Sequence, residues 1–215
     1  MNANTIVWAI LIITVLVSAK GFDDYAFFER YKFKISSILK GKQYERLFTS
    51  GFLHVGWVHL LFNMITLYFF SNSLIYTFSV LIFVIIYLGA ILAGNLTTLC
   101  FSQKDSQYNA VGASGGVSGV IYSAIVLTPQ IELLVFPLPI PIPGWIFAIV
   151  YMYYSIFGMQ NQWGNLGHSA HLGGAVFGLL ITIFLKPELI FVHGLYIILI
   201  LIPIVYVIFT EIRRR

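Results

Sequence analysis

The sequence predicts an all-α polytopic transmembrane helix bundle, and three observations lead to this fold class. Of the 215 residues, 59% are hydrophobic and only 9% are charged, whereas roughly 25% of the residues of a soluble domain are charged. The mean hydropathy is +0.90, which is typical of a chain whose surface faces lipid. Apolar stretches near the ~20 residues that a helix needs to cross the hydrocarbon layer recur along the chain. We therefore predict a single membrane domain over residues 1–215.

Seven apolar spans are expected to form the helices of this bundle. They lie at about residues 5–19, 53–70, 74–101, 114–128, 144–159, 169–185 and 189–210. The first span ends in VLVSA, which is similar to a signal cleavage site, but residues 1–5 carry no basic side chain as a signal peptide requires. We expect it to be a retained helix. The loop that follows it, about residues 20–52, holds most of the charge.

The fourth span is short and begins with the sequence GASGGVSG. A helix of about 15 residues must begin below the membrane surface, and polar backbone at that depth is tolerated only beside protein or a water-filled cavity. We therefore expect Ser114 to lie at the floor of a wet pocket. The Pro-rich run PLPIPIPGW at 137–145 predicts an extended connector to the fifth span.

Polar side chains inside membrane spans are costly and mark candidate functional sites. Three clusters stand out, and their members are His54, His59, Asn63, Ser114, His168 and His171. The carboxylates lie in loops or at helix ends, which excludes a Ser–His–Asp triad and a His-Glu-x-x-His zinc site. A serine nucleophile with a histidine base and no third member is left. We expect no metal or other cofactor, and the scattered basic residues argue against a nucleic-acid partner.

Helix geometry separates the two glycine-flanked serines. The first N–H groups of a helix have no intrahelical partner and carry the positive end of the helix dipole, so an oxyanion can bind there. Ser114 fits that terminus, while Ser118 lies one turn deeper, where its N–H is used inside the helix. The alternative for both serines is close packing of small residues against another helix, and we favour it for Ser118.

The same geometry separates the histidines of the sixth span. Each residue of a helix turns by about 100°, which places Gly174 and Gly178 within about 60° and 20° of His171. Because these glycines form a close-packing face, His171 is expected to look across it toward a partner serine. A core histidine bonded to a backbone carbonyl is the alternative. For His168, at about 120° and 80° from the glycines, we favour a structural or pocket-rim role.

His59 and Asn63 are four residues apart and share one helix face. Both can donate hydrogen bonds to an oxyanion, although an interhelical hydrogen bond would also explain the pair. His54 points elsewhere, and we interpret it as a structural residue of the loop or helix start.

The chain resembles the rhomboid family of intramembrane serine proteases. The resemblance covers about residues 44–185 and rests on ERLFTSGFLHVGWVHLLFNM at 45–64, GASG at 112–115 and AHLGGAVFG at 170–178. It implies a bacterial-type six-helix core over about 1–185, with an additional C-terminal helix and basic tail over 186–215. It also implies a multi-pass protein of the bacterial inner membrane that cleaves transmembrane or juxtamembrane segments of membrane-protein substrates.

The resemblance assigns roles to individual residues. Ser114 becomes the nucleophile and His171 the general base, and His59, Asn63 and the Ser114 backbone N–H become the oxyanion hole. The supporting residues that match the family motifs are Gly112, Gly115, Gly174, Gly178, His54 and Arg46. A non-catalytic relative that binds client helices is the alternative function, and a metal or haem site built from the four histidines is a third.

Two positions depart from the family pattern. The family's first loop usually has Trp-Arg, where this chain has Glu45-Arg46, so the seating of that loop is open. Many members also have an aromatic residue one turn after the nucleophile, stacked on the catalytic histidine, where this chain has Ser118. Either His171 is then held less rigidly, or a hydrogen bond replaces the stack.

The loop charges conflict with the orientation that the resemblance implies. Eleven of the 12 Lys and Arg residues fall on the side of the 20–52 loop, and Lys186 alone falls on the other. The positive-inside rule makes the former side cytoplasmic, whereas bacterial family members open their active site toward the outside. We favour the family orientation.

Overall fold

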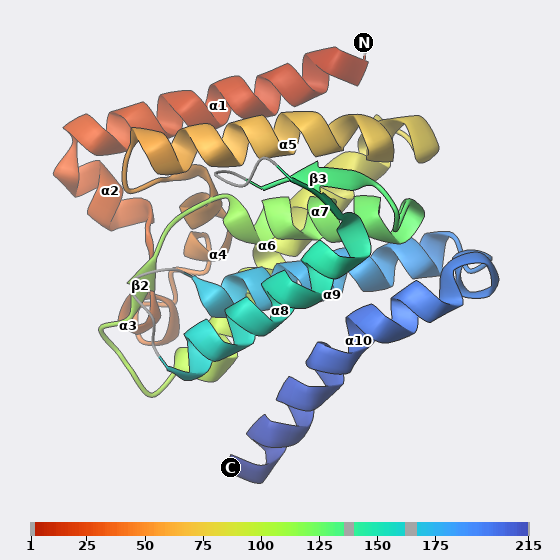
Figure 1. Cartoon of the computed structure of the whole chain (residues 1–215). Helices are drawn as coiled ribbons and strands as arrows, with labels where there is room; N and C mark the ends of the chain where they lie inside the picture. Colours follow the sequence, from red (N-terminus) through yellow and green to blue (C-terminus); the bar gives the residue numbers. More distant parts are fainter. Residues whose placement is uncertain (1–2, 136–139, 162–166, 215) are drawn as a thin grey trace.

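The computed structural model describes residues 3–135, 140–161 and 167–214, and it is an all-α helix bundle with two small β-ladders (Figure 1). The elements in chain order are α1 (Ala3–Asp23), α2 (Tyr25–Tyr31), β1 (Phe33–Lys34), α3 (Ile35–Leu39), α4 (Arg46–Thr49), η1 (Ser50–Phe52), α5 (Trp57–Thr77), α6 (Val80–Ser102), β2 (Asn109–Ala110), α7 (Ser114–Leu127), β3 (Glu132–Leu134), β4 (Pro141–Pro143), α8 (Gly144–Gln160), α9 (His168–Leu185) and α10 (Leu189–Arg214).

The predicted fold class is confirmed. The helices α1, α5, α6, α7, α8, α9 and α10 correspond one to one to the seven predicted spans. The boundary between the second and third spans was predicted too early, because α5 continues to Thr77 and α6 begins at Val80. Among the described residues, five of these helices (α1, α5, α6, α9 and α10) are long and apolar enough to cross a membrane. The chain is thus a multi-pass membrane protein whose exposed apolar side chains face lipid.

The short helix α7 is the centre of the bundle. Every residue from Gly115 to Val126 is buried, and α5, α6, α8 and α9 all pack against it. Its 14 residues span only about 21 Å at 1.5 Å per residue, less than the ~30 Å hydrocarbon thickness. A helix of this length cannot cross the hydrocarbon layer by itself, which is consistent with the predicted start of α7 below the membrane surface.

Glycines bring α7 and α9 into backbone contact. A Cβ atom at Gly174 would lie 2.0 Å from the carbonyl oxygen of Gly115, and one at Gly178 would lie 2.0 Å from that of Gly119. Neither position has room for any side chain. The predicted close-packing face of α9 is confirmed, and this contact fixes the helix starts, with Ser114 on α7 and His171 on α9, relative to each other.

The segment between α1 and α5 folds into short elements at the end of the bundle where α7 and α9 begin (Figure 1). Strand β1 pairs antiparallel with β2, with Phe33 opposite Ala110. Phe33 belongs to a small separate core, which also contains Ile35, Ile38 and Leu47. This end of the molecule therefore has its own hydrophobic cluster, and the cluster holds the loop before α7 in place.

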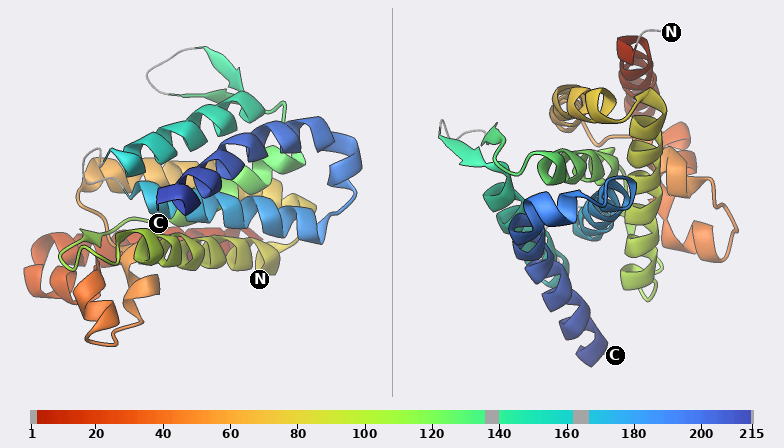
Figure 2. Two further views of the ribbon diagram at one scale, coloured as in Figure 1. Left: turned by 90° about the horizontal axis from the view of Figure 1, so that it is seen from below. Right: turned by 90° about the vertical axis from the view of Figure 1, so that its right-hand side faces the viewer.

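At the opposite end, β3 pairs with β4 as an antiparallel hairpin that leads into α8. The extended part of the predicted connector is confirmed at Pro141–Pro143, while residues 137–139 lie outside the described residues. Helix α10 packs mainly on α8, and its backbone leaves helical geometry at His193. Its C-terminal part projects away from the other helices (Figures 1 and 2).

Candidate active site

Ser114 and His171 meet at the starts of two buried helices. Ser114 is the first residue of α7, and His171 lies in the first turn of α9. The distance from Ser114 Oγ to His171 Nε2 is 2.7 Å, which is a hydrogen bond. The side chain of His171 is 8% exposed. The facing pair that helix periodicity predicted is therefore present, and the alternative of a backbone carbonyl partner for Nε2 is not.

The two amides that precede Ser114 are held by the first loop. The N–H of Gly112 donates to the Ser50 carbonyl at 3.0 Å, and the N–H of Ala113 donates to His54 Nε2 at 3.4 Å. The first hydrogen bond of α7 runs from the Val117 N–H to the Ala113 carbonyl. The amide of Ser114 thus lies ahead of the hydrogen-bonded part of the helix, where the dipole is positive.

His54 connects three segments through one hydrogen-bond chain, which supports its predicted structural role. Since Nε2 accepts from Ala113, the proton of the neutral ring is on Nδ1 and is donated to Ser18 Oγ at 2.9 Å. The Ser18 hydroxyl in turn donates to the Phe52 carbonyl at 2.9 Å. Burial lowers the pKa of His54 to about 3, with the nearby His59 adding to the effect. His54 is therefore neutral at physiological pH, as this chain of donors requires.

Gly112 has a backbone conformation that brings His59 close to Ser114. Its φ of +137° lies in the region that favours glycine. A Cβ atom here would lie 2.8 Å from His59 Cε1 and 3.6 Å from Ser114 Oγ. The absence of a side chain at Gly112 leaves space beside both groups.

A cavity of about 1120 Å³ opens at this point. Ser114, His171, His59 and Asn63 all line it, together with the loop over residues 105–111. Among the described residues, His59 Nδ1, Asn63 Nδ2 and His171 Nδ1 are buried without a hydrogen-bond partner. Buried polar atoms without partners are rare in proteins, and those of His59 and Asn63, which line the cavity together with Ser114, indicate a place where a polar group can bind. An interhelical hydrogen bond does not account for the Asn63 amide.

An aromatic ring covers the imidazole of His171, but it does not come from α7. Tyr151 of α8 stacks on His171 with ring centroids 5.8 Å apart and planes at 29°. Its hydroxyl lies 3.3 Å from Ser118 Oγ. From Ser118 we expected either a less rigidly held His171 or a hydrogen bond in place of the aromatic stack. Both expectations need correction, because Tyr151 provides the stack and Ser118 lies within hydrogen-bond distance of the Tyr151 hydroxyl.

His168 is buried and lies at the edge of this cluster. Its ring makes edge contacts with Tyr154 at 5.2 Å and with His171 at 6.1 Å between centroids. This agrees with a structural role. Among the described residues, no three His, Cys, Asp or Glu side chains lie close enough to hold a metal ion.

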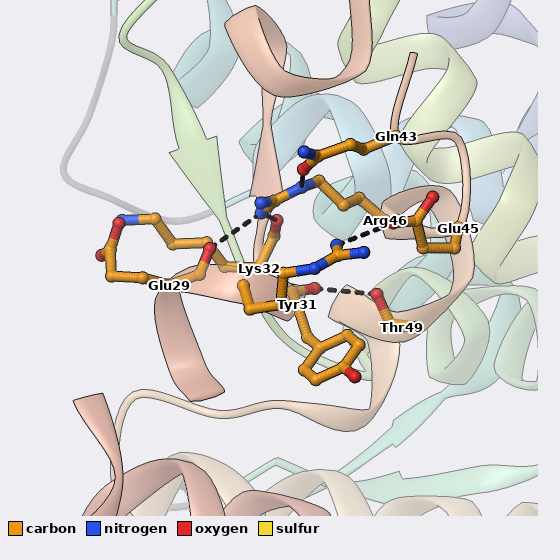
Figure 3. A network of polar contacts seen from close by, with 8 residues as sticks. Glu29, Tyr31, Lys32, Gln43, Glu45, Arg46 and Thr49 are labelled. Carbon is orange, nitrogen blue, oxygen red and sulfur yellow. Dashed lines mark hydrogen bonds and ion pairs between the residues drawn. The ribbon is translucent and has the colours of Figure 1, made fainter. Parts of the chain in front are cut away.

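Arg46 anchors the first loop although the residue before it is Glu45 (Figure 3). Arg46 is 4% exposed. Its Nε donates to Gln43 Oε1 at 2.7 Å, and its Nη1 donates to the carbonyls of Glu29 and Lys32 at 2.9 Å and 2.6 Å. The loop is thus held by a buried guanidinium.

Glu45 makes a different contact, an exposed ion pair with Arg30 at 2.7 Å. The hydrogen bond from Arg30 lowers the pKa of the Glu45 carboxyl. Glu45 therefore faces water on the outside of the loop.

Sequence reasoning missed several residues of the site. Tyr151 is one of three tyrosines within four residues of α8, and only the packing of α8 determines which of them meets His171. Asn95 of α6 donates to Ser50 Oγ at 3.0 Å and to the Leu47 carbonyl at 2.8 Å, which supports the segment that holds Gly112. Asn95, as a polar residue inside an apolar span, was the available signal.

Comparisons with known proteins agree with this architecture. The family model described as "Rhomboid domain" matches residues 41–188. The chain is 30% identical over 135 residues to "Rhomboid protein 1, mitochondrial" of Saccharomyces cerevisiae, a match that covers 61% of this chain and 39% of that protein. It is 27% identical over 176 residues to "RHOMBOID-like protein 12, mitochondrial" of Arabidopsis thaliana (75% of this chain, 52% of that protein).

A human relative shows the same pattern. The chain is 30% identical over 134 residues to "Presenilin-associated rhomboid-like protein, mitochondrial" of Homo sapiens, which covers 60% of this chain and 35% of that protein. The matches thus span between about a third and a half of the relatives' own length.

Proposed function

Because the chain belongs to the rhomboid family, we propose that it is an intramembrane serine endopeptidase. Its substrates are membrane proteins, and it cleaves their transmembrane or juxtamembrane segments. The observation that carries this proposal is the 2.7 Å hydrogen bond between Ser114 Oγ and His171 Nε2, at a cavity that both residues line.

The chemistry follows from that pair. His171 Nε2 takes the proton of the Ser114 hydroxyl as the oxygen attacks the substrate carbonyl, and then gives it to the leaving amine. An acyl-enzyme on Ser114 results. A water molecule that enters through the cavity, deprotonated by His171, hydrolyses the acyl-enzyme and restores the serine. The two residues act as a dyad, since His171 Nδ1 has no partner among the described residues.

The oxyanion of the tetrahedral intermediate needs hydrogen-bond donors. The Ser114 N–H at the start of α7, the His59 ring and the Asn63 amide take this role. Support for it comes from the unpartnered buried atoms His59 Nδ1 and Asn63 Nδ2, which belong to residues that line the same cavity as Ser114. Removal of one such donor commonly lowers the rate by about 100- to 1000-fold.

The location follows in part from the fold. The chain is a multi-pass membrane protein in a lipid environment, while the relatives described above are named as mitochondrial proteins. We propose the inner membrane of a bacterium as the location, because the sequence motifs resemble those of bacterial-type family members. Membrane fractionation of the native source tests it, and recovery in mitochondria would contradict it.

The test is cleavage of a transmembrane substrate by purified protein in detergent or liposomes. We expect Ser114→Ala and His171→Ala to abolish cleavage, and Asn63→Ala to lower kcat by about 100- to 1000-fold. Ser118→Ala, which alters the other glycine-flanked serine but leaves the Tyr151 ring in place, is the comparison variant and should retain most of the cleavage activity. If Ser114→Ala cleaves as fast as wild type, the proposal is wrong. A wild-type protein that neither cleaves nor reacts with a serine-directed probe would instead support a non-catalytic relative that binds client helices.

A further inference from the structure

The base of a Ser–His dyad needs something to hold its ring in position. In a triad, a carboxylate bonded to Nδ1 fixes both the tautomer and the orientation of the imidazole. In this chain, His171 Nδ1 is buried and has no hydrogen-bond partner among the described residues. The orientation of the His171 ring must therefore come from the side chains that pack against it.

Among the described residues, the ring that packs flat on His171 belongs to α8. Tyr151 lies 5.8 Å from the imidazole between centroids with planes at 29°. Phe147, one turn from Tyr151 on the same helix, in turn stacks on Tyr151 at 5.5 Å and 15°. Among the described residues, Phe147, Tyr151 and His171 therefore form a chain of stacked rings. Among the described residues, the ring of His168 also lies near His171, but it meets the imidazole at 77° and offers only an edge.

Two hydrogen bonds fix the register of α8 on α7. They thereby fix the position of the Tyr151 ring along the helix axis. Ser118 Oγ lies 3.3 Å from the Tyr151 hydroxyl, and the Tyr122 hydroxyl donates to the Ala148 carbonyl at 2.5 Å. Ser118 and Tyr122 are one turn apart on α7, and Ala148 and Tyr151 are about one turn apart on α8. A sliding or rotation of α8 would break both bonds, so Tyr151 stays over the imidazole.

The small size of Ser118 is part of this arrangement. Ser118 is 1% exposed and lies one turn after Ser114. A large side chain at this position would meet the Tyr151 hydroxyl, which lies 3.3 Å from Ser118 Oγ. We therefore expect a ring at position 118 to compete with that of Tyr151 for the space beside His171.

We propose that Tyr151 is the positioning residue of the general base, and that Ser118 serves this function by leaving space for its ring and binding its hydroxyl. The inference rests on the proposed dyad function and deepens it. It assigns a role to Tyr151 that requires no contact with substrate. The expected defect is therefore in the chemical step and not in substrate binding.

The first test replaces the ring. Tyr151→Leu is expected to lower kcat on cleavage of a transmembrane substrate by about 3- to 10-fold, which corresponds to the loss of one aromatic pair, with KM unchanged. The reaction rate of Ser114 with a small fluorophosphonate should fall by the same factor, because that reaction needs His171 but no substrate helix. Tyr153→Leu is the matched control, since Tyr153 lies on the same helix and packs on Phe157 and Tyr206.

The second test separates positioning from folding. Tyr151→Phe keeps the stack and should stay within about twofold of wild type, whereas Tyr151→Met fills the space without a ring and should show the full loss even if Tyr151→Leu does not fold. The exchange Ser118→Tyr with Tyr151→Ser moves the ring to α7 and should recover activity relative to Tyr151→Ser alone. Thermal unfolding in detergent establishes that each variant compared is folded.

The results that would overturn the role of Tyr151 differ from the result that would overturn the proposed function. A folded Tyr151→Met or Tyr151→Leu protein with unchanged kcat and labelling rate overturns the inference, as does an equal loss in Tyr153→Leu. A change in KM with constant kcat also overturns it, because it would make Tyr151 a substrate contact. If wild type itself neither cleaves nor reacts, the proposed function fails and not this assignment alone.

Discussion

At the scale of single residues, the position of Ser114 depends on the glycine two residues before it. Gly112 has φ of +137° and lies where a Cβ would press on His59. It also gives its N–H to the Ser50 carbonyl. One backbone conformation thus connects the first loop, the proposed nucleophile and a proposed oxyanion donor.

We expect Gly112→Ala to lower kcat by about 10- to 100-fold, because the new side chain meets His59 and the backbone strain of about 1–3 kcal/mol falls on the site. Cleavage of a transmembrane substrate measures the effect. Gly194→Ala in α10 is the control, since a Cβ there meets nothing within 4 Å. Equal activity of Gly112→Ala and wild type would show that the space beside His59 is not used.

Residue-level prediction from the sequence succeeded where helix periodicity applies and failed where it does not. The facing of His171 and Ser114 follows from the stripe that His171 forms with Gly174 and Gly178, and their contact is present. Tyr151 could not be found in this way, because its role depends on how α8 packs on α7 and α9. The serine at position 118, where many family members have an aromatic residue, indicated that His171 is supported differently in this chain. It did not indicate which residue provides that support.

At the scale of elements, the seven membrane helices could be predicted and the short elements of the first loop could not. A long apolar run predicts a membrane helix from its local composition alone, as α5 and α6 illustrate. The elements α2, α3, α4 and β1 depend on distant partners instead. Phe33, for example, is completely buried through its pairing with β2 and its contact with Tyr108.

Arg46 contacts several of these segments through a planar fork of donors, a geometry that a lysine ammonium does not reproduce. Arg46→Lys should lower the free energy of unfolding by about 2 kcal/mol, because hydrogen bonds to the buried carbonyls are lost. Unfolding in detergent, by heat or by SDS, measures this change. Arg30→Lys keeps the exposed ion pair with Glu45 and should behave as wild type. Equal stability of Arg46→Lys and wild type would contradict the anchor role.

At the scale of the whole molecule, two criteria predict opposite orientations in the membrane. One is the orientation of bacterial family members, and the other is the distribution of basic residues between the two ends. The starts of α7 and α9 lie at the same end as the first loop (Figure 1). The first loop, Lys104 and the C-terminal tail hold 11 of the 12 basic residues. The positive-inside rule makes that end cytoplasmic, but seven of these residues belong to the folded first loop, where Arg46 and Lys32 are buried.

We expect the end that contains the site to face outward. In a Cys100→Ser background, which removes the single native cysteine, Gln103→Cys reports on this end and Glu188→Cys on the other. A membrane-impermeant maleimide added to intact bacterial cells that express these variants should label Gln103→Cys alone. Labelling of Glu188→Cys alone would show that the loop charges determine the orientation.

The central claim is that Ser114, and not Ser118, is the nucleophile activated by His171. Reaction of the purified protein with a fluorophosphonate, followed by mass-spectrometric mapping of the modified residue, tests this claim most directly. We predict a single phosphonylated site at Ser114, which disappears in His171→Ala and persists in Ser118→Ala. Modification at Ser118, or equal modification of the wild type and His171→Ala, would contradict it.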